Sequence, residues 1–151
     1  MKDHQLKHKL IGAGVLPICP ATRRVLLCKR GSHQSNPLTW ATWGGGFEEG
    51  VDKTPKDCAK REFWEETRCK HSYKISKKPI FTVDHLSFKY YVYAGIFDME
   101  WVPDIETEKE AAGWGWFYLD DLPSPLIKDL RNFFDNDVRI VENLIRYFQP
   151  R

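Results

Sequence analysis

The sequence lacks several features that would assign it to a class at once. It has no run of 18 apolar residues, which excludes a transmembrane helix of the usual kind. Its charged first residues contain no apolar stretch of the sort found in signal peptides. Neither charge dominates, because 23 Lys and Arg stand against 21 Asp and Glu, giving a net charge of +2. We therefore expect neither a membrane nor a nucleic acid as a partner.

Cysteine pairs of the zinc-binding kind are also missing. The four cysteines are Cys19, Cys28, Cys58 and Cys69, and no two of them form a C-x-x-C pair. Because zinc sites commonly use such pairs, a structural zinc ion is not expected. Cys19 and Cys28 lie within apolar runs, which predicts buried, reduced thiols and a cytoplasmic protein.

The composition is that of a folded protein. Apolar residues make up 42% of the 151 residues and aromatic residues 14%. This is enough for a hydrophobic core within one domain of common size. No internal repeat, low-complexity segment or linker is visible. We predict a single domain over residues 1–151, in which residues 1–8 form a short basic tail.

Hydrophobic patterning predicts alternating strands and helices. Two apolar runs joined by a turn predict a hairpin over 10–18 and 25–28, followed by a loop over 31–39. Residues 80–83, 89–97 and 114–119 are typical of strands. Apolar residues at helical spacing predict a C-terminal amphipathic helix over 136–148. The order of elements indicates an α/β sandwich with helices packed on a sheet.

A further helix has clear start signals. Thr54 is a good N-cap residue, and Pro55 suits the first helical position. Asp57 stands where a capping box places its acidic residue. We therefore predict a helix from Pro55 to about Arg68.

Three carboxylates share one face of this helix. Glu62, Glu65 and Glu66 are spaced i, i+3 and i+4, and such residues lie side by side. Carboxylates this close repel one another unless a positive charge joins them, and hard oxygen ligands suit Mg²⁺ or Mn²⁺. The alternative is a solvated acidic face on which Arg61 pairs with Glu65.

A glycine run precedes the helix and favours the metal interpretation. Gly44–Gly46 predicts a tight turn, from which a backbone carbonyl can complete a metal shell. Two phosphate-binding motifs are excluded. Gly45 to Gly50 is not followed by the Lys-Ser/Thr of a P-loop, and no helix or third glycine follows Gly12 and Gly14.

At this point the sequence resembles the Nudix hydrolase family, which includes MutT-like proteins. The Nudix box reads G-x5-E-x7-R-E-U-x-E-E-x-G-U, where U is an apolar residue. Residues 44–50 (GGGFEEG) are similar to its opening, and residues 61–66 (REFWEE) match its R-E-U-x-E-E core. Residues 116–123 (WFYLDDLP) are similar to a late W-F-x-L-D-E-L-P segment. The resemblance covers residues 8–148.

Two positions depart from the box. Residues 51–53 (VDK) stand where the family has a single glutamate, so that two residues are inserted and the first Glu of the box is missing. Asp52 is the candidate to replace its carboxylate. Arg68 stands in place of the glycine near the helix C-terminus, where a left-handed conformation is favoured. Arg68 therefore either adopts that conformation at a cost or ends the helix differently.

The resemblance implies a fold, a reaction and a site. The expected fold is an α/β/α sandwich with a mixed β-sheet, and the expected reaction is Mg²⁺-dependent hydrolysis of a pyrophosphate bond. The implied metal ligands are Gly45, Glu62, Glu65 and Glu66. Arg61 would hold the carboxylates in place. The general base is either Glu62 or Glu110 from the loop before the late Trp segment.

The substrate is less defined. The resemblance implies a nucleoside diphosphate linked to another group, as in a nucleoside triphosphate or a nucleotide sugar such as GDP-mannose. Arg30 is a candidate to touch phosphate, and several rings are candidates to stack on a base: Trp40 above all, with Trp43, Phe81, Tyr91 and Trp114. A homodimer is possible within such a family. The alternative function is a Nudix-fold nucleotide-binding module with impaired catalysis.

Overall fold

The computed structural model describes residues 9–105 and 111–150. Within these ranges the fold consists of two helices and eight strands. The helices are α2 (Pro55–Thr67) and α3 (Lys128–Tyr147). The strands are β1 (Leu10–Cys19), β2 (Arg24–Arg30), β3 (Trp40–Ala41), β4 (Trp43–Gly46), β5 (Lys74–Ile75), β6 (Phe81–Asp84), β7 (Phe88–Ile96) and β8 (Ala111–Tyr118).

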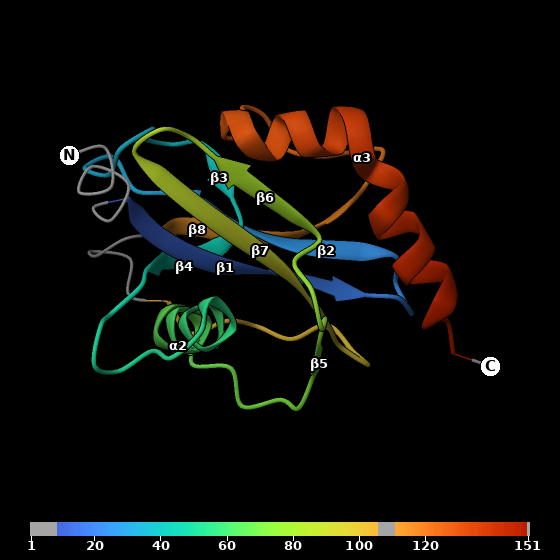
Figure 1. Ribbon diagram of the computed structural model, residues 1–151. Helices are drawn as coiled ribbons and strands as arrows, with labels where there is room; N and C mark the ends of the chain where they lie inside the picture. Colours follow the sequence, from blue (N-terminus) through green and yellow to red (C-terminus); the bar gives the residue numbers. More distant parts are fainter. Residues whose placement is uncertain (1–8, 106–110, 151) are drawn as a thin grey trace.

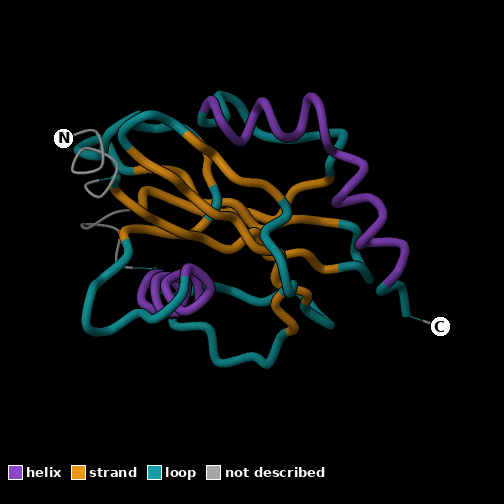
Figure 2. Tube along the Cα trace, viewed as in Figure 1, coloured by secondary structure: helices purple, strands orange, loops and turns teal. Residues whose placement is uncertain are grey.

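All eight strands belong to one mixed sheet. β1 pairs in parallel with β7 from Leu10–Phe88 to Ile18–Ile96, whereas the remaining pairings are antiparallel. Helix α2 lies on one side of the sheet and α3 on the other, as Figure 1 shows. Figure 2 shows that the loops on either end of α2 run along the same side as that helix. The predicted α/β/α sandwich with a mixed sheet is confirmed.

Strand β1 lies at the centre and is covered on both faces. Its inner residues are buried without interruption because alternate side chains enter two different cores. Val15 belongs to the core under α2, whereas Leu16 belongs to the core under α3. The apolar run at the start of the chain is thus a strand buried on both faces. The predicted hairpin, the loop over 31–39 and the burial of Cys19 and Cys28 are confirmed.

Helix α2 begins and ends as its sequence dictates. The Thr54 side chain accepts a hydrogen bond from the Asp57 amide, and the Asp57 carboxylate accepts one from the Thr54 amide. At the other end Arg68 adopts the left-handed conformation, with φ 54° and ψ 35°. Its amide donates to the Trp64 carbonyl, and its guanidinium lies 4.4 Å from the centre of the Trp64 ring. Of the two alternatives for Arg68, the structure has the strained one, offset by this stacking.

The C-terminal helix is longer than the sequence indicated. It begins at Lys128 rather than at residue 136, with non-helical backbone angles at Asp137. No side chain caps its start at Ile127, so the signal that revealed α2 is absent here. Phe133 and Phe134, in the part of the helix that was not predicted, are buried. No helix within the described ranges combines the length and apolar character needed to cross a membrane.

The glycine run is a strand, not the predicted turn. Gly44, Gly45 and Gly46 of β4 pair antiparallel with Gly14, Ala13 and Gly12 of β1. None of the three has a positive φ, which in this loop region is confined to Gly50. The run therefore does not need glycine for a tight turn, and its glycines serve close packing instead.

Replacement of Thr54 by alanine tests the helix start. Because the Thr54 hydroxyl accepts the hydrogen bond from the Asp57 amide, we expect Thr54→Ala to lower the free energy of unfolding by about 1 kcal/mol. Urea denaturation measures the change. Thr54→Ser keeps a capping hydroxyl and is the matched control. Equal losses in both variants, or no loss in Thr54→Ala, would contradict the assigned cap.

Candidate active site

Of the three predicted carboxylates on α2, Glu65 is exposed, whereas Glu62 and Glu66 are partly buried. The buried side of the helix comprises Cys58, Ala59, Phe63 and Thr67. This burial fixes the rotation of the helix, so Glu62, Glu65 and Glu66 face away from the core or lie at its edge. The Glu62 side chain is 17% exposed and that of Glu65 is 47% exposed.

Arg61 organises the surrounding segments. Its Nε donates to Asp52 at 2.9 Å, and its Nη2 donates to Asp52 at 2.7 Å and to the Gly46 carbonyl at 2.9 Å. Its Nη1 donates to Glu62 at 3.2 Å and to Glu65 at 3.1 Å. A guanidinium has five donors, and here each finds an acceptor. The hydrogen bonds that Arg61 donates to Asp52 contribute most to raising the pKa of Arg61.

Asp52 supplies the carboxylate opposite Arg61. Its side chain is only 2% exposed, and it also accepts a hydrogen bond from the Glu48 amide at 2.9 Å. The hydrogen bonds from Arg61 are the main cause of a pKa below the ordinary value for aspartate. The longer loop over residues 51–53 thus places a carboxylate against Arg61 although the glutamate of the box is missing.

Strand β4 and helix α2 meet at Gly45. A Cβ added at Gly45 would lie 2.4 Å from the nearer carboxylate oxygen of Glu62. Glycine is therefore needed for this close approach. The Gly45 carbonyl lies 3.6 Å from Cys58 Sγ, and burial raises the pKa of that thiol to about 11. Gly45 and Glu62, predicted as metal ligands, are in contact.

The carboxylates of α2 fit a metal ion that is shared with a substrate. Among the described residues, no three His, Cys, Asp or Glu side chains stand ready to enclose an ion. Glu65, for example, turns toward Arg61. Mg²⁺ prefers oxygen ligands and commonly takes one or two carboxylates together with water and substrate phosphates. The donor chemistry therefore suits Mg²⁺ or Mn²⁺, without a cage built from protein alone.

A pocket of about 470 Å³ opens beside this site, on the α3 side of the sheet. Its inner wall is mainly apolar, and its rim is polar. The inner residues are Phe81, Val83, Phe88, Tyr90, Val92, Ile127 and Leu130, and the rim includes Arg30, Ser35, Asn36, His85, Lys128 and Asp129. Gly44 and Gly45 also line the pocket. The pocket thus reaches the strand against which the Glu62 carboxylate lies.

The predicted substrate contacts are only partly brought to this pocket. Arg30 lines it, with its guanidinium donating to the backbone and side-chain oxygens of Ser35. Trp40 does not line it and instead packs edge-on against Phe117. Of the other candidate rings, Phe81 lines the pocket, whereas Trp43 is fully buried in the core under α2. Glu110, the alternative base, lies outside the described residues.

The sequence did not single out Tyr90, which lines the pocket and packs over Gly44. Its ring lines the pocket, and its hydroxyl is enclosed near Gly44. Burial is the main cause of a raised pKa for this phenol, and the negative charge of Glu66 is the next. The sequence offered one sign of this packing, the pair Gly12 and Gly14. These glycines do not belong to a phosphate-binding motif but lie under the Tyr90 side chain.

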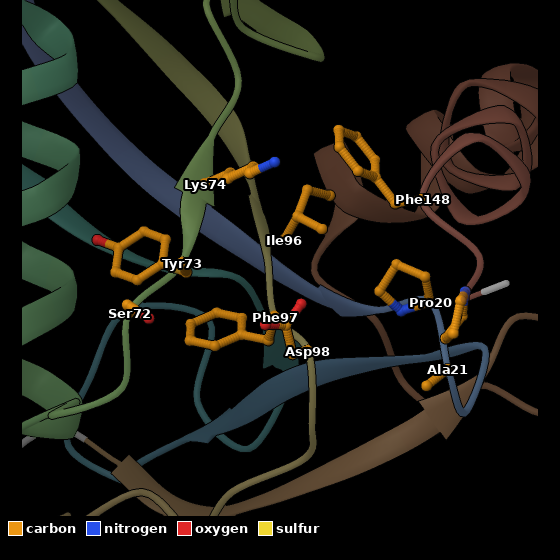
Figure 3. A pocket seen from close by; sticks show the side chains of 10 residues that line it. Pro20, Ala21, Ser72, Tyr73, Lys74, Ile96, Phe97, Asp98 and Phe148 are labelled. Atoms are coloured by element: carbon orange, nitrogen blue, oxygen red, sulfur yellow. The ribbon is translucent and has the colours of Figure 1, made fainter.

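A second hollow lies away from the carboxylates. It has a volume of about 500 Å³ and is lined by residues of the β1–β2 turn, β5, the end of β7 and the C-terminus (Figure 3). Tyr73 stacks on Phe97 in its wall. Among the described residues, Asp98 is the one acidic side chain that lines it, and the described site residues predicted from the sequence do not belong to it. The pocket beside Glu62 is therefore the stronger candidate for substrate.

Comparison with known proteins agrees with this geometry. The model of the NUDIX domain matches residues 8–137. The chain belongs to the NUDIX family. It is therefore a hydrolase that acts on phosphoric anhydrides, as the sequence predicted.

Solved structures share the fold at low sequence identity. A MutT NUDIX hydrolase from Burkholderia pseudomallei is 23% identical, with a TM-score of 0.68 over 85% of this chain and 98% of that one. The NUDIX domain of Shewanella oneidensis NrtR, solved with ADP ribose, is 19% identical, with a TM-score of 0.69 over 95% of this chain and 99% of that one. A MutT protein from Methanosarcina mazei is 21% identical, with a TM-score of 0.64 over 89% of this chain and 95% of that one.

The pairing of Asp52 with Arg61 predicts a pH-dependent loss of stability on substitution. A carboxylate whose pKa falls on folding stabilises the fold above its unfolded pKa, here 3.8, and loses this contribution as the pH falls through the lower folded value. We expect Asp52→Asn to lower the free energy of unfolding by about 2 kcal/mol at neutral pH. The difference from the wild type should shrink below pH 3.8.

Urea denaturation at neutral pH and at about pH 3 measures both effects. Asp120→Asn, at an exposed aspartate, is the matched control and should behave as the wild type. A difference between Asp52→Asn and the wild type that stays constant down to the lower pH would contradict this account of the ion pair.

Proposed function

We propose that the NUDIX protein hydrolyses a pyrophosphate bond in a nucleoside diphosphate linked to another group, with Mg²⁺ or Mn²⁺. The observation that carries this proposal is the position of the pocket. Gly44 and Gly45 line it, and the Glu62 carboxylate lies against the second of these. A substrate with one end in the pocket would bring its phosphates to the carboxylates of α2.

The walls of the pocket support a nucleotide-derived substrate. Phe81, Val83 and Phe88 offer apolar and aromatic surface of the kind that receives a base or a sugar. Arg30 and Lys128 at the rim carry positive charge suited to phosphate. The NUDIX domain of Shewanella oneidensis NrtR was solved with ADP ribose, which is a compound of this class. We include nucleoside triphosphates and nucleotide sugars among the candidates.

Residues of α2 and β4 would each have a role in the reaction. The metal ion would be held by Gly45 of β4 and by Glu62, Glu65 and Glu66 of α2. When bound, it would neutralise charge on the phosphates and lower the pKa of bound water. Glu62 would accept the proton of the attacking water, with Glu110 as the alternative base. Arg61 would keep Glu62 and Glu65 in position through the hydrogen bonds from its Nη1.

The arrangement around Arg61 favours an enzyme over an impaired binding module. That alternative drew its support from the missing glutamate and from Arg68. Asp52 now pairs with Arg61, and Arg68 ends α2 in the left-handed conformation. Neither departure disturbs the face of the helix that carries the carboxylates. A binding module would retain the pocket but turn over none of its ligands.

Glu66→Gln tests the proposed reaction. We expect Mg²⁺-dependent hydrolysis of at least one compound in a panel of nucleoside triphosphates, ADP-ribose, GDP-mannose and dinucleoside polyphosphates. The substitution should lower kcat by more than about 100-fold. Loss of a residue that only orients a metal ligand commonly costs about 10–100-fold, and loss of the ligand itself should cost more. Release of nucleotide and phosphate is measured by chromatography with and without Mg²⁺.

Glu142→Gln, at an exposed glutamate on α3, is the control and should keep full activity. Activity that persists in Glu66→Gln would remove Glu66 from the site. Binding of nucleotides without turnover by the wild type would favour the binding module.

Filling the pocket tests where the substrate lies. Val83 lines the pocket, whereas its neighbour Thr82 is exposed and points to the other side of β6. We expect Val83→Trp to raise KM for the best panel substrate by about tenfold, which corresponds to about 1.4 kcal/mol of lost binding. Thr82→Trp is the matched control. Equal KM values for both variants would place the substrate elsewhere.

A further inference from the structure

Three glycines make room for the side chain of Tyr90. Tyr90 pairs with Gly12 across the parallel strands β7 and β1. A Cβ added at Gly12 would lie 2.8 Å from the Tyr90 ring, and one added at Gly14 would lie 2.7 Å from its hydroxyl. At Gly44 on β4 the separation from the hydroxyl would be only 2.0 Å. The tyrosine thus reaches across β1 to β4 over a surface without side chains.

The hydroxyl of Tyr90 lies on the face of β4 opposite to the carboxylates of α2. It lies over Gly44, and the next residue, Gly45, packs against the Glu62 carboxylate. Of the charged groups around it, Glu66 has the largest electrostatic effect on the phenol, and Glu62 also contributes. The phenol and the two carboxylates therefore face the same short segment of β4 from different sides.

The ring of Tyr90 has a different environment from its hydroxyl. The ring lines the pocket together with Val83, its partner across β6 and β7. Tyr90 is thus in contact both with the proposed substrate pocket and with the strand that supports the carboxylates. Of the three atoms nearest to a Cβ added at Gly44, only the Tyr90 hydroxyl belongs to a side chain.

We propose that Tyr90 is a positioning residue of the hydrolase site, whose hydroxyl packs on Gly44 and, through strand β4, keeps Gly45 and the Glu62 carboxylate against it in the geometry that binds the metal. This inference rests on the proposed function, because it assigns the Glu62 carboxylate to a metal ion. The ring lines the pocket, and the hydroxyl acts on Glu62 only through Gly44 and Gly45. Partners that orient metal ligands commonly change metal affinity or activity by about 10–100-fold when removed.

Tyr90→Phe separates the two parts of the side chain. It keeps the ring and the floor of the pocket but removes the hydroxyl. We expect kcat for the best panel substrate to fall about tenfold while KM stays within about twofold, and Mn²⁺ binding without substrate to weaken by a similar factor. Steady-state kinetics and electron paramagnetic resonance titration of free Mn²⁺ give the two readouts.

Tyr93→Phe is the matched control. Tyr93 lies on the same strand and is buried, but it belongs to the core under α2 and not to the pocket. The same loss of a hydroxyl there should leave kcat and Mn²⁺ binding unchanged. Thermal denaturation of both variants shows whether the two substitutions affect the fold equally.

Two results would overturn the role of Tyr90. One is wild-type kcat and wild-type Mn²⁺ affinity in Tyr90→Phe. The other is a change in KM alone, which would make the side chain a pocket wall and nothing more. Failure of the proposed function is a separate result, in which the wild type hydrolyses no panel compound. The comparison of Mn²⁺ affinity between wild type and Tyr90→Phe still decides for or against Tyr90 in that case.

Discussion

The guanidinium of Arg61 is the interaction on which the site depends. One side chain satisfies all five of its donors on three segments that are separate in the sequence: the loop at Asp52, strand β4 at Gly46 and helix α2 itself. Two glutamates of α2 share the same cation, so that their mutual repulsion is offset before any metal binds. The position of β4 against α2 and the orientation of the carboxylates therefore have a common cause.

The sheet divides the remaining work between its two faces. The face under α2 carries the carboxylates and the aromatic core around Phe63, whereas the face under α3 carries the pocket. Strand β4 lies between the carboxylates and the pocket: Gly44 lines the pocket, and its neighbour Gly45 packs against the Glu62 carboxylate. Gly12, Gly14 and Gly44 leave the room that the Tyr90 side chain fills. Glycine at these positions is thus required for the packing of Tyr90.

Local signals predicted the part of the fold that local interactions determine. Helix α2 was predicted within a residue at both ends, because Thr54 and Asp57 form its cap from neighbouring positions. The start of α3 was missed because its turns are held by tertiary burial without a cap. The glycine run was misread as a turn, since its pairing with β1 depends on residues some thirty positions away. The partnership of Asp52 with Arg61 likewise became visible only when the loop was folded.

The glycine surface under Tyr90 also bears on how such a site can change over generations. Any side chain introduced at Gly12, Gly14 or Gly44 would collide with backbone or with the phenol. A single mutation at these positions would therefore rarely be neutral. The rim residues of the pocket, such as Arg30 and Asn36, are not confined in this way. Divergence toward new substrates would accordingly accumulate at the rim, while the floor stays the same in descendants that differ in what they cleave.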